Sequence, residues 1–485
     1  MIESQEVELK LELQPRDVAA FRALALLGDT PRRAVRQVTT YFDTPEGALR
    51  KAGYSLRLRR KGRRCLQTVK HKGADSGGFS ARAEWERKVD GPALDFEGLK
   101  TTPVGEILTK KKLRERLAPV SETRVARTTW LLKREGSAIE LILDEGEVSG
   151  GGRAEPICEI ELELKKGDRR HLFELAREIG RAVPLRMGVM SKSERGFVLV
   201  DGGGVRARKA DPVELHGEMK VAEAFAAIVQ SCLRHYRLNE ALAKARKAGS
   251  LHQARVAIRR LRSALSLFRP AVTDAGFERH REALRAFAGE LGEARNLDVI
   301  LGSRRGPEAG SEAERKAERR RLKAAREEAY DRVEAILEGA QLPALILDLV
   351  AWSETGAWRE SEIAQRPIAP FAAERLSKRW KKVRKVGVDM AGLEPEARHR
   401  LRIDIKKLRY ASEFFAGLAA KAQKAPRKAF LTELEALQEA LGELNDMETA
   451  RELAPDIPPA ADEGALLAEA QAAHDRLRAV GAYWR

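Results

Sequence analysis

The sequence predicts a multidomain α+β chain, with an antiparallel β domain first and an all-α domain after it. Over roughly the first 200 residues, charged and apolar residues alternate with the period of two that is typical of β-strands. From about Glu218 onward, apolar residues recur at helical spacing, and Ala, Leu, Glu, Arg and Lys dominate. Between the two regions, Gly202–Gly204 followed by Pro212 indicates a linker.

Length and charge limit the classes of function. A chain of 485 residues allows two or three domains. Lys and Arg number 90 against 73 Asp and Glu, which gives a formal net charge of +17. The excess favours anionic partners, namely nucleic acid, polyphosphate, anionic lipid or phosphorylated small molecules. Aromatic residues make up only 5% of the chain, which disfavours recognition of single strands by base stacking.

The cysteines and the first residues favour a cytoplasmic protein. Cys65, Cys158 and Cys232 are far apart and have no metal-ligand spacing, as expected in a reducing compartment. Met1–Glu6 lacks the basic and apolar parts of a secretory signal. The sequence contains no run of about 18 apolar residues, which is the length that would predict a membrane span. We therefore expect a cytoplasmic protein without a membrane partner.

The first β domain begins with an unusual charged strand face. In Glu6-Val-Glu-Leu-Lys10 the charged and apolar residues alternate. Because side chains of a strand point alternately to its two faces, Glu6, Glu8 and Lys10 share one face. Such a face is often simply solvated. Its recurrence along the following strands favours a lined interior instead.

Charged faces recur on most of the later predicted strands, of which we expect about eight in all. The recurring faces are Arg57 with Arg59, Lys70 with Lys72, Arg82 with Glu84 and Glu86, Glu140 with Ile142 and Asp144, and Glu159 with Glu161 and Glu163. A further strand over Val120–Lys133 carries Arg124 and Arg127. One interpretation is a sheet with a solvated exterior; the other is a closed barrel with a charged lumen. Such a lumen would hold a divalent cation on carboxylates and an oligophosphate on Lys and Arg.

These motifs, taken in order, resemble the CYTH or triphosphate tunnel metalloenzyme superfamily. The matching motifs are Glu6-x-Glu8-x-Lys10, Tyr41–Pro45, Leu56–Arg59, Thr68–Lys70, Glu159–Glu163 and Ser191–Gly196. The resemblance covers about 200 residues. It implies an eight-stranded antiparallel tunnel with flanking helices, in which a triphosphate is hydrolysed or cyclised with Mg²⁺ or Mn²⁺ as cofactor.

The resemblance also implies roles for individual residues. It implies metal binding by four carboxylates, Glu6, Glu8, Glu159 and Glu161, and a catalytic role for Lys70. It implies triphosphate binding by a basic set: Lys10, Arg57, Arg59, Lys70, Lys72, Arg82, Arg124, Arg127, Lys192 and Arg195. Ser121 stands where the family has a large apolar residue, which leaves the choice between Arg124 and Arg127 open.

Two helices of the second region carry basic ridges in the same register. The first ridge comprises His252, Arg255, Arg259 and Arg262, with Arg260 on its flank. Because a helix turns by about 100° per residue, the four ridge residues fall within an arc of roughly 80° of its surface. The second ridge comprises His399, Arg402, Lys406 and Arg409, with Lys407 beside it. One basic helix face is usually a solvated surface, but an internal repeat of this kind favours a positive channel. No acidic or cysteine residue at ligand spacing supports a metal site at either histidine.

This second region resembles the CHAD domain over about residues 217–482. The family is similar to two repeated four-helix bundles around a basic pore that binds inorganic polyphosphate. The predicted domains are a tunnel domain at 1–200, a linker at 201–216 and a helical domain at 217–482, with halves at about 217–300 and 370–482. Ridges of Arg and Lys suit a linear polyanion, and no feature predicts the reading of bases, so nucleic acid is a disfavoured partner.

The resemblance to CYTH–CHAD fusions predicts a metal-dependent inorganic triphosphatase joined to a polyphosphate-binding module. Adenylate cyclase and nucleoside or thiamine triphosphatase activity in the same tunnel remain open alternatives. A third alternative is a non-catalytic adaptor of polyphosphate granules.

Overall fold

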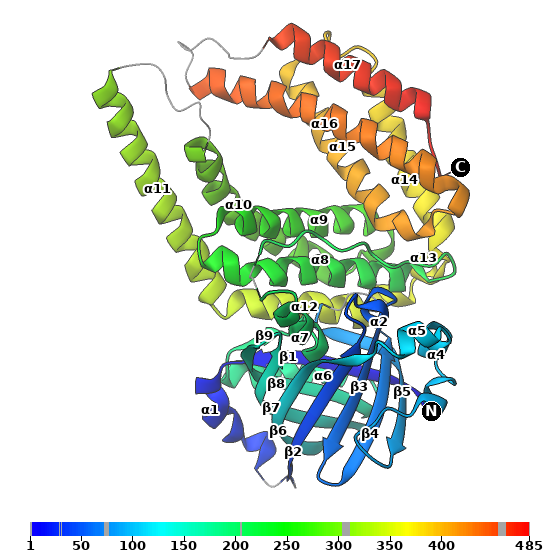
Figure 1. The fold of residues 1–485 in the computed structure, drawn as a ribbon. Coiled ribbons are helices and arrows are strands. Elements are labelled where there is room, and N and C mark those ends of the chain that lie inside the picture. Colours follow the sequence, from blue (N-terminus) through cyan, green and yellow to red (C-terminus); the bar gives the residue numbers. More distant parts are fainter. Residues whose placement is uncertain are drawn as a thin grey trace. The chain divides into compact units, whose positions relative to one another are not determined.

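The structure, a computed structural model, describes residues 2–28, 30, 32–71, 77–203, 206–302, 311–453 and 462–484. It forms two compact units (Figure 1). The β unit comprises Met1–Arg208, Leu233–Leu242 and Ile336–Thr355. The helical unit comprises Lys209–Cys232, Ala243–Ala335 and Gly356–Arg485. Two short segments that follow the predicted linker therefore belong to the β unit. Gly204 of that linker lies outside the described residues.

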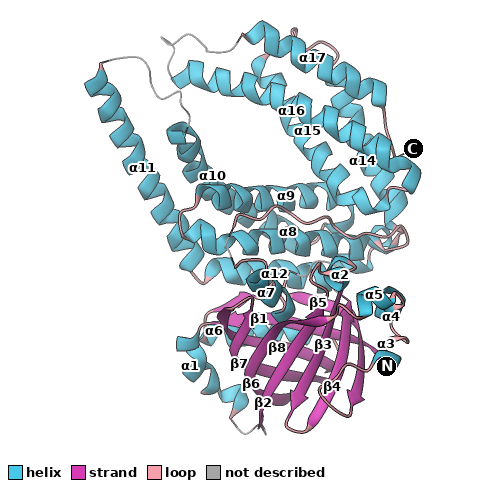
Figure 2. Cartoon of the chain, in the orientation of Figure 1, coloured by secondary structure: helices cyan, strands magenta, loops and turns pink. Residues whose placement is uncertain are grey.

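Eight strands of the described residues close into a ring in the β unit (Figure 2). They are β1 (Ile2–Leu13), β2 (Arg32–Asp43), β3 (Tyr54–Lys61), β4 (Arg64–His71), β5 (Phe79–Val89), β6 (Ala118–Arg134), β7 (Ser137–Gly150) and β8 (Arg153–Lys166). Neighbours around the ring are antiparallel, in the order β1-β5-β4-β3-β2-β6-β7-β8, and β8 pairs with β1 again. The predicted eight-stranded antiparallel tunnel is confirmed. A short ninth strand, β9 (Leu185–Met187), which the sequence does not predict, pairs with the end of β1.

Strand alternation decides which side chains line the tunnel. In the β1–β8 ladder Lys10 lies opposite Glu161, and Glu8 lies opposite Glu163. The charged face of β1 is therefore the inner face, and Leu9 and Leu11 point outward. Both leucines are nevertheless buried, because helices cover the outside of the ring.

Short helices form the cover of the ring. They are α1 (Val18–Arg22), α2 (Ala48–Lys51), α3 (Phe96–Leu99), α4 (Pro103–Leu108), α5 (Lys111–Arg114), α6 (Arg170–Ala182) and α7 (Lys192–Val200). The apolar residues of α6 recur with helical spacing, and its Phe173 ring lies 5.4 Å from that of Phe79 on β5. On another part of the ring, Leu56 and Val69 of β3 and β4 pack with Val104 of α4.

Helices make up most of the remaining chain and confirm the predicted all-α domain. They are α8 (Val221–Lys244), α9 (Ala248–Val272), α10 (Ala275–Gly302), α11 (Glu312–Glu338), α12 (Gln341–Thr355), α13 (Glu362–Gln365), α14 (Ile368–Val386), α15 (Pro395–Phe414), α16 (Lys424–Leu453) and α17 (Glu463–Val480). In the helical unit, the Phe268 ring of α9 lies 5.3 Å from Phe225, 5.1 Å from Phe371 and 6.0 Å from Phe415. This aromatic group joins α8, α9 and α14 in one core.

Within the described residues, no single helix is long and apolar enough to cross a membrane; by length and composition alone, the bent pair Glu312–Glu338 and Gln341–Glu360 passes that test together.

The pairing of β6 with β7 depends on a glycine. A Cβ added at Gly146 would lie 2.0 Å from the Arg124 carbonyl oxygen and 2.8 Å from Val125 Cα. Because both atoms belong to the backbone of the neighbouring strand, they have little freedom to move.

We expect Gly146→Ala to lower the free energy of unfolding by about 1–3 kcal/mol in urea titrations followed by tryptophan fluorescence. Gly180→Ala is the matched control: a Cβ there meets nothing within 4 Å, and alanine in a helix stabilises by about 0.5–1 kcal/mol. Equal stability of the two variants would contradict the packing described for Gly146.

Candidate functional site

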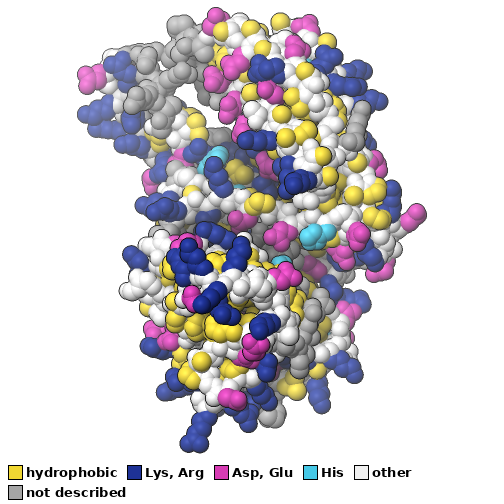
Figure 3. Space-filling view, turned by 45° about the vertical axis from the view of Figure 1, so that its right-hand side comes forward, with side chains coloured by type: hydrophobic (Ala, Val, Ile, Leu, Met, Phe, Trp, Pro, Cys, Tyr) yellow, Lys and Arg dark blue, Asp and Glu magenta, His cyan; other side chains and the backbone are white. Residues whose placement is uncertain are grey.

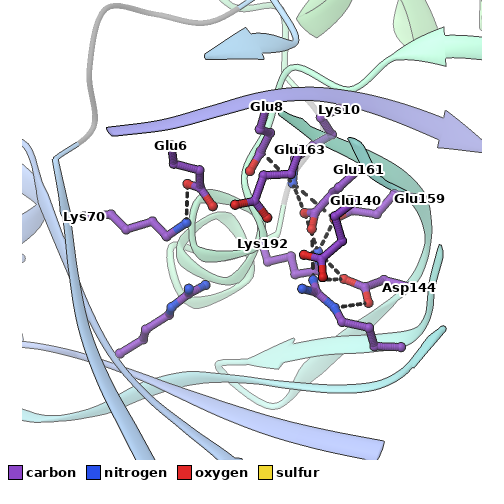
Figure 4. A network of polar contacts seen from close by, with 12 residues as sticks. Glu6, Glu8, Lys10, Lys70, Glu140, Asp144, Glu159, Glu161, Glu163 and Lys192 are labelled. Atoms are coloured by element: carbon purple, nitrogen blue, oxygen red, sulfur yellow. Dashed lines mark hydrogen bonds and ion pairs between the residues drawn. The ribbon is translucent and has the colours of Figure 1, made fainter. Parts of the chain in front are cut away.

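The inner face of β1 points its charges into the enclosed space of the ring (Figure 4). Lys10 Nζ donates to Glu159 Oε1 at 3.1 Å and to Glu161 Oε1 at 2.9 Å. Glu8 Oε1 lies 4.0 Å from the same Nζ. Two strands that are distant in sequence, β1 and β8, thus contribute to one charged cluster because they are neighbours in the ring.

Three buried carboxylates form the centre of this cluster. The side chains of Asp144, Glu159 and Glu161 each have an oxygen within 4.8 Å of the others. We call these three residues the acidic trio. Their proximity follows from the β7–β8 register, in which Asp144 lies directly opposite Glu159. Asp144 is 0% exposed. Buried carboxylates at this spacing repel one another strongly, so they require cations.

Two cations besides Lys10 supply that compensation. Lys192, the first residue of α7, places Nζ 2.7 Å from Asp144 Oδ2 and 2.9 Å from Glu161 Oε1, and it also pairs with Glu159. Arg127 of β6 donates Nε to Asp144 Oδ1 at 2.7 Å and Nη2 to Glu161 Oε2 at 2.9 Å. The trio is therefore contacted from β1, β6 and α7 at once.

The protonation states follow from these contacts. Burial by itself raises the pKa of Glu161, but Lys10, Lys192 and Arg127 hold it well below its usual range. Burial likewise opposes ionisation of Asp144, yet Lys192 and Arg127 lower its pKa. Burial acts to lower the pKa of Lys10, whereas Glu159, Glu161 and Glu8 raise it. At neutral pH Glu161 and Asp144 are thus ionised, and Lys10 is protonated.

A second group of charges lines β1, β3, β4 and β5. Lys70 Nζ lies 2.5 Å from Glu6 Oε2 and 3.3 Å from Glu84 Oε2. Arg57 Nη2 donates to Glu84 Oε1 at 3.3 Å. Lys70, the predicted catalytic residue, therefore faces the tunnel lumen together with Glu6. Its catalytic role stays a prediction.

Arg59 differs from the other tunnel cations. Within the described part of the chain, it forms no ion pair with a carboxylate, and its Nε atom is buried without a hydrogen-bond acceptor. Burial lowers its pKa, and the neighbouring charges of Arg57 and Arg127 lower it further, to about 10. A half-buried guanidinium that lies near the like charges of Arg57 and Arg127, offset only in part by Glu161, is a site where an anion would be stabilised.

One predicted triphosphate ligand is wrong. Arg127 lies inside the ring, so Arg124, three residues earlier, lies on the outer face of β6. Its side chain is 66% exposed and lies 2.8 Å from Glu122 and 3.9 Å from Glu147. The sequence left the choice between the two arginines open, and strand parity decides it in favour of Arg127.

For three other predicted triphosphate ligands, the structure does not decide the role. Lys72 lies outside the described residues. The backbone of Arg82 lies opposite Glu6 in the β1–β5 ladder. Arg195 of α7 donates Nη2 to the Pro156 carbonyl at 2.5 Å. These three assignments stay predictions.

Asp144 is not among the metal ligands predicted from the sequence. The signal was present, because Glu140, Ile142 and Asp144 were expected on one strand face. What the sequence lacks is the register that sets Asp144 beside Glu159. The predicted partners Glu6 and Glu8 line the same lumen but do not belong to the trio, and their metal-binding role stays a prediction.

The two basic ridges face each other in the helical unit. Burial lowers the pKa of Lys406 on the second ridge, and the charges of Arg402, Arg259, Arg255 and Arg409 contribute, bringing it to about 8. Charges from both α9 and α15 therefore act on one amine. Burial and Arg295 of α10 lower the pKa of His252. Figure 3 shows how widely Lys and Arg side chains are spread over the face in view.

The internal repeat has the same local geometry in both copies. Arg255 lies over Gly292 of α10, where an added Cβ would be 3.6 Å from Nη2. Arg402 lies over Gly442 of α16, where the corresponding distance is 3.5 Å. In each copy a glycine on the following helix therefore leaves room for a ridge arginine.

Arg260, predicted to bind polyphosphate from the flank of the first ridge, does not face solvent. Its side chain is buried, donates to Glu413 Oε2 at 2.8 Å and lies over the Phe414 ring at 5.1 Å. It is a structural contact between α9 and α15. Arg409 also contacts Glu413, at 2.8 Å, and Lys407 lies 3.7 Å from Asp404. For these two residues, polyphosphate binding stays a prediction.

Two family models match this chain, the CYTH domain over residues 4–197 and the CHAD domain over residues 227–455. The chain joins a CYTH domain to a CHAD domain. The CYTH match spans the tunnel ring, apart from the first two residues of β1, and the first six residues of α7. The CHAD match spans both basic ridges.

Similar proteins include an inorganic triphosphatase from Haemophilus influenzae, which is 28% identical over 197 residues. The match covers 40% of this chain and 55% of that protein, so the CYTH–CHAD chain spans about half the length of this curated relative. The solved CHAD domain from the plant Ricinus communis is 30% identical over 57% of this chain and 96% of that chain, with a TM-score of 0.44. A candidate adenylyl cyclase from Hippeastrum, described as having a dominant triphosphatase activity, is 19% identical over 40% of this chain and 96% of that chain, with a TM-score of 0.33.

The acidic trio predicts a measurable cation site. Asp144→Asn keeps the shape of the side chain but removes one of the three charges that would attract a divalent cation. We expect Mn²⁺ binding, measured by calorimetry, to weaken at least about tenfold. Asp348→Asn is the control, because Asp348 of α12 pairs with Arg177 of α6, outside the lumen, at 2.7 Å. Unchanged Mn²⁺ affinity in Asp144→Asn, with a normal melting temperature, would refute the trio as a cation site.

Proposed function

We propose that the CYTH tunnel hydrolyses inorganic triphosphate with Mg²⁺ or Mn²⁺. The observation that carries the proposal is the acidic trio, buried among three cations in a closed ring of strands. Transfer of a phosphoryl group needs mainly positioning and charge neutralisation, and the tunnel supplies charges of both signs. The inorganic triphosphatase of Haemophilus influenzae, 28% identical over 197 residues, supports the choice of substrate.

The acidic trio has the donor set that a hard divalent cation prefers. All three residues offer carboxylate oxygens, the ligands that suit Mg²⁺ and Mn²⁺. Asp144, Glu159 and Glu161 would hold the ion, with Glu8 beside them. When bound, the ion neutralises phosphate charge and activates a coordinated water. Lys10 and Lys192, which now compensate the trio, would then be available to phosphate oxygens.

The arginines and Lys70 provide the remaining triphosphate contacts. Arg59 offers a charge with no carboxylate partner among the described residues, and Arg57 and Lys70 share Glu84. A triphosphate that enters the lumen replaces these carboxylate pairs with charge-assisted bonds to phosphate oxygens. In this proposal Lys70 contacts the phosphoryl group that is transferred.

The CHAD ridges are proposed to bind inorganic polyphosphate. Lys406 lies within the field of four arginines from α9 and α15, so the ridges concentrate positive charge in one place. A linear polyanion neutralises such a row of charges without any sequence-specific contact. The proposed protein is thus a triphosphatase with a polyphosphate-binding partner domain in the same chain.

The activity is tested by phosphate release from tripolyphosphate, ATP and thiamine triphosphate, with Mg²⁺ or Mn²⁺, while cyclic AMP is monitored in parallel. We expect tripolyphosphate to be preferred. Glu161→Gln should reduce turnover to background, because it removes a trio carboxylate from its cations. Glu178→Gln on α6, whose partner is Arg134, is the control.

Preference for ATP with cyclic AMP formation would favour a cyclase. Preference for ATP or thiamine triphosphate with phosphate release would favour an organic triphosphatase. No turnover of any substrate would leave a polyphosphate-binding adaptor.

The pKa of Lys406 predicts how polyphosphate binding depends on pH. A bound polyanion raises this pKa, so binding takes up a proton when the free amine is neutral. Affinity should therefore be highest below the Lys406 pKa of about 8 and fall above it. The fall should approach about tenfold per pH unit for a single proton. The dissociation constant measured between pH 7 and pH 9.5 checks this. Lys406→Arg stays charged and should flatten the dependence; an equally steep fall in that variant would contradict the assignment.

A further inference from the structure

The backbone that carries Lys192 into the tunnel is closely packed. The N–H of Gly188 donates to the Lys10 carbonyl at 2.9 Å, and a Cβ at Gly188 would lie 2.7 Å from Lys10 Cγ. Ser191 then caps α7: its Oγ accepts from the Glu194 N–H at 3.2 Å, and Glu194 Oε2 accepts from the Ser191 N–H at 2.8 Å. This capping box fixes the first turn of α7, where Lys192 is the first residue.

Arg234 of α8 holds the same backbone. It donates Nη2 to Glu194 Oε1 at 2.8 Å and Nη1 to the Val189 carbonyl. Its side chain is only 7% exposed. The planar guanidinium makes both bonds in a fixed geometry that a lysine cannot reproduce. Glu194 is therefore used twice, once to cap α7 and once to bind Arg234.

A second arginine of α8 supports this contact. Arg237, about one turn after Arg234, donates Nε to the Met187 carbonyl at 3.0 Å and Nη2 to Glu12 Oε2 at 2.9 Å. Both arginines lie within Leu233–Leu242, a segment that belongs to the β unit although its sequence falls in the CHAD match. The tunnel therefore takes part of its support from residues that the CYTH match does not contain.

We propose that Arg234 is a positioning residue for the tunnel, which acts through α7 to keep the Lys192 amine at the acidic trio. The proposal rests on the triphosphatase function proposed above. Without Arg234, Glu194 Oε1 and the Val189 carbonyl lose a buried charge-assisted partner, which leaves the start of α7 free to shift. Lys192 Nζ contacts all three trio carboxylates, and such a set of contacts does not survive a displacement of about 1 Å, which can cost about 10²-fold in rate.

The test uses the full chain with Arg234→Met, which keeps much of the apolar stem and removes the guanidinium. We expect kcat for tripolyphosphate to fall about 10- to 100-fold. We also expect KM to rise, because Lys192 would no longer be placed to bind phosphate. A variant that only unfolds in part would lose active enzyme and keep its KM. Arg234→Lys should be intermediate, since one amine can reach Glu194 but cannot also hold the Val189 carbonyl.

Two further variants separate the proposed contact from a general loss of charge. Arg177→Met removes an arginine of the β unit that binds Asp348 at 2.7 Å and makes none of the contacts described at α7. It should leave kcat and KM unchanged. Glu194→Gln keeps a capping oxygen but loses the charge that faces Arg234. In the double variant, the effects of Glu194→Gln and Arg234→Met on kcat and KM should not add, because both substitutions break the same contact between Arg234 and Glu194.

Hydrogen exchange at the backbone amides of residues 189–196 gives a readout that needs no activity. In Arg234→Met these amides should exchange at least about tenfold faster than in the wild-type chain, while the amides of β7 keep their protection. If the wild-type chain is active and Arg234→Met has the kcat and KM of Arg177→Met, the proposal is overturned. If the wild-type chain releases no phosphate, the triphosphatase proposal fails, and exchange then decides alone: unchanged exchange at 189–196 rejects a positioning role.

Discussion

The requirement that buried charges be compensated governs the β unit. Three carboxylates at the centre of a ring of strands are stable only if cations reach them from several directions. Lys10 comes from β1, Arg127 from β6 and Lys192 from α7. Each of these elements must hold its place for the charges to balance. The closed ring, the helices packed outside it and the capping box of α7 can all be understood as the means of keeping these side chains in position.

The same requirement supports the proposed binding of a triphosphate in the tunnel. Among the described residues, many of its acids and bases pair with one another, whereas the charge of Arg59 is opposed by Arg57 and Arg127. A cation at the trio and an anion at the arginines would exchange internal pairs for external ones without leaving a charge uncompensated. The site is thus poised for two ligands of opposite sign that bind together, as a metal–phosphate complex does.

Much of the fold could be predicted from the sequence, because alternation and helical periodicity are local. Strand alternation identified the inner face of β1, and the helical wheel identified both ridges. What could not be predicted depends on pairing between distant segments. The position of Asp144 beside Glu159 requires the β7–β8 register, and the burial of Arg260 requires Glu413, 153 residues further along the chain. Arg234 carries no motif at all, since its role arises only where α8 meets the start of α7.

The closed ring also determines the stage of chain synthesis at which the site can form. Lys10 and Glu159 are separated by 149 residues, and Lys192 follows later still. A chain emerging from the ribosome therefore exposes its first strand long before the last strand that closes the ring is available to pair with it. Closure over such a sequence distance is slow compared with local helix formation, and an unpaired strand edge is prone to associate with other chains. A product that ends before β8 carries Glu6 and Glu8 but no tunnel, so synthesis assembles the proposed triphosphate site in one late step.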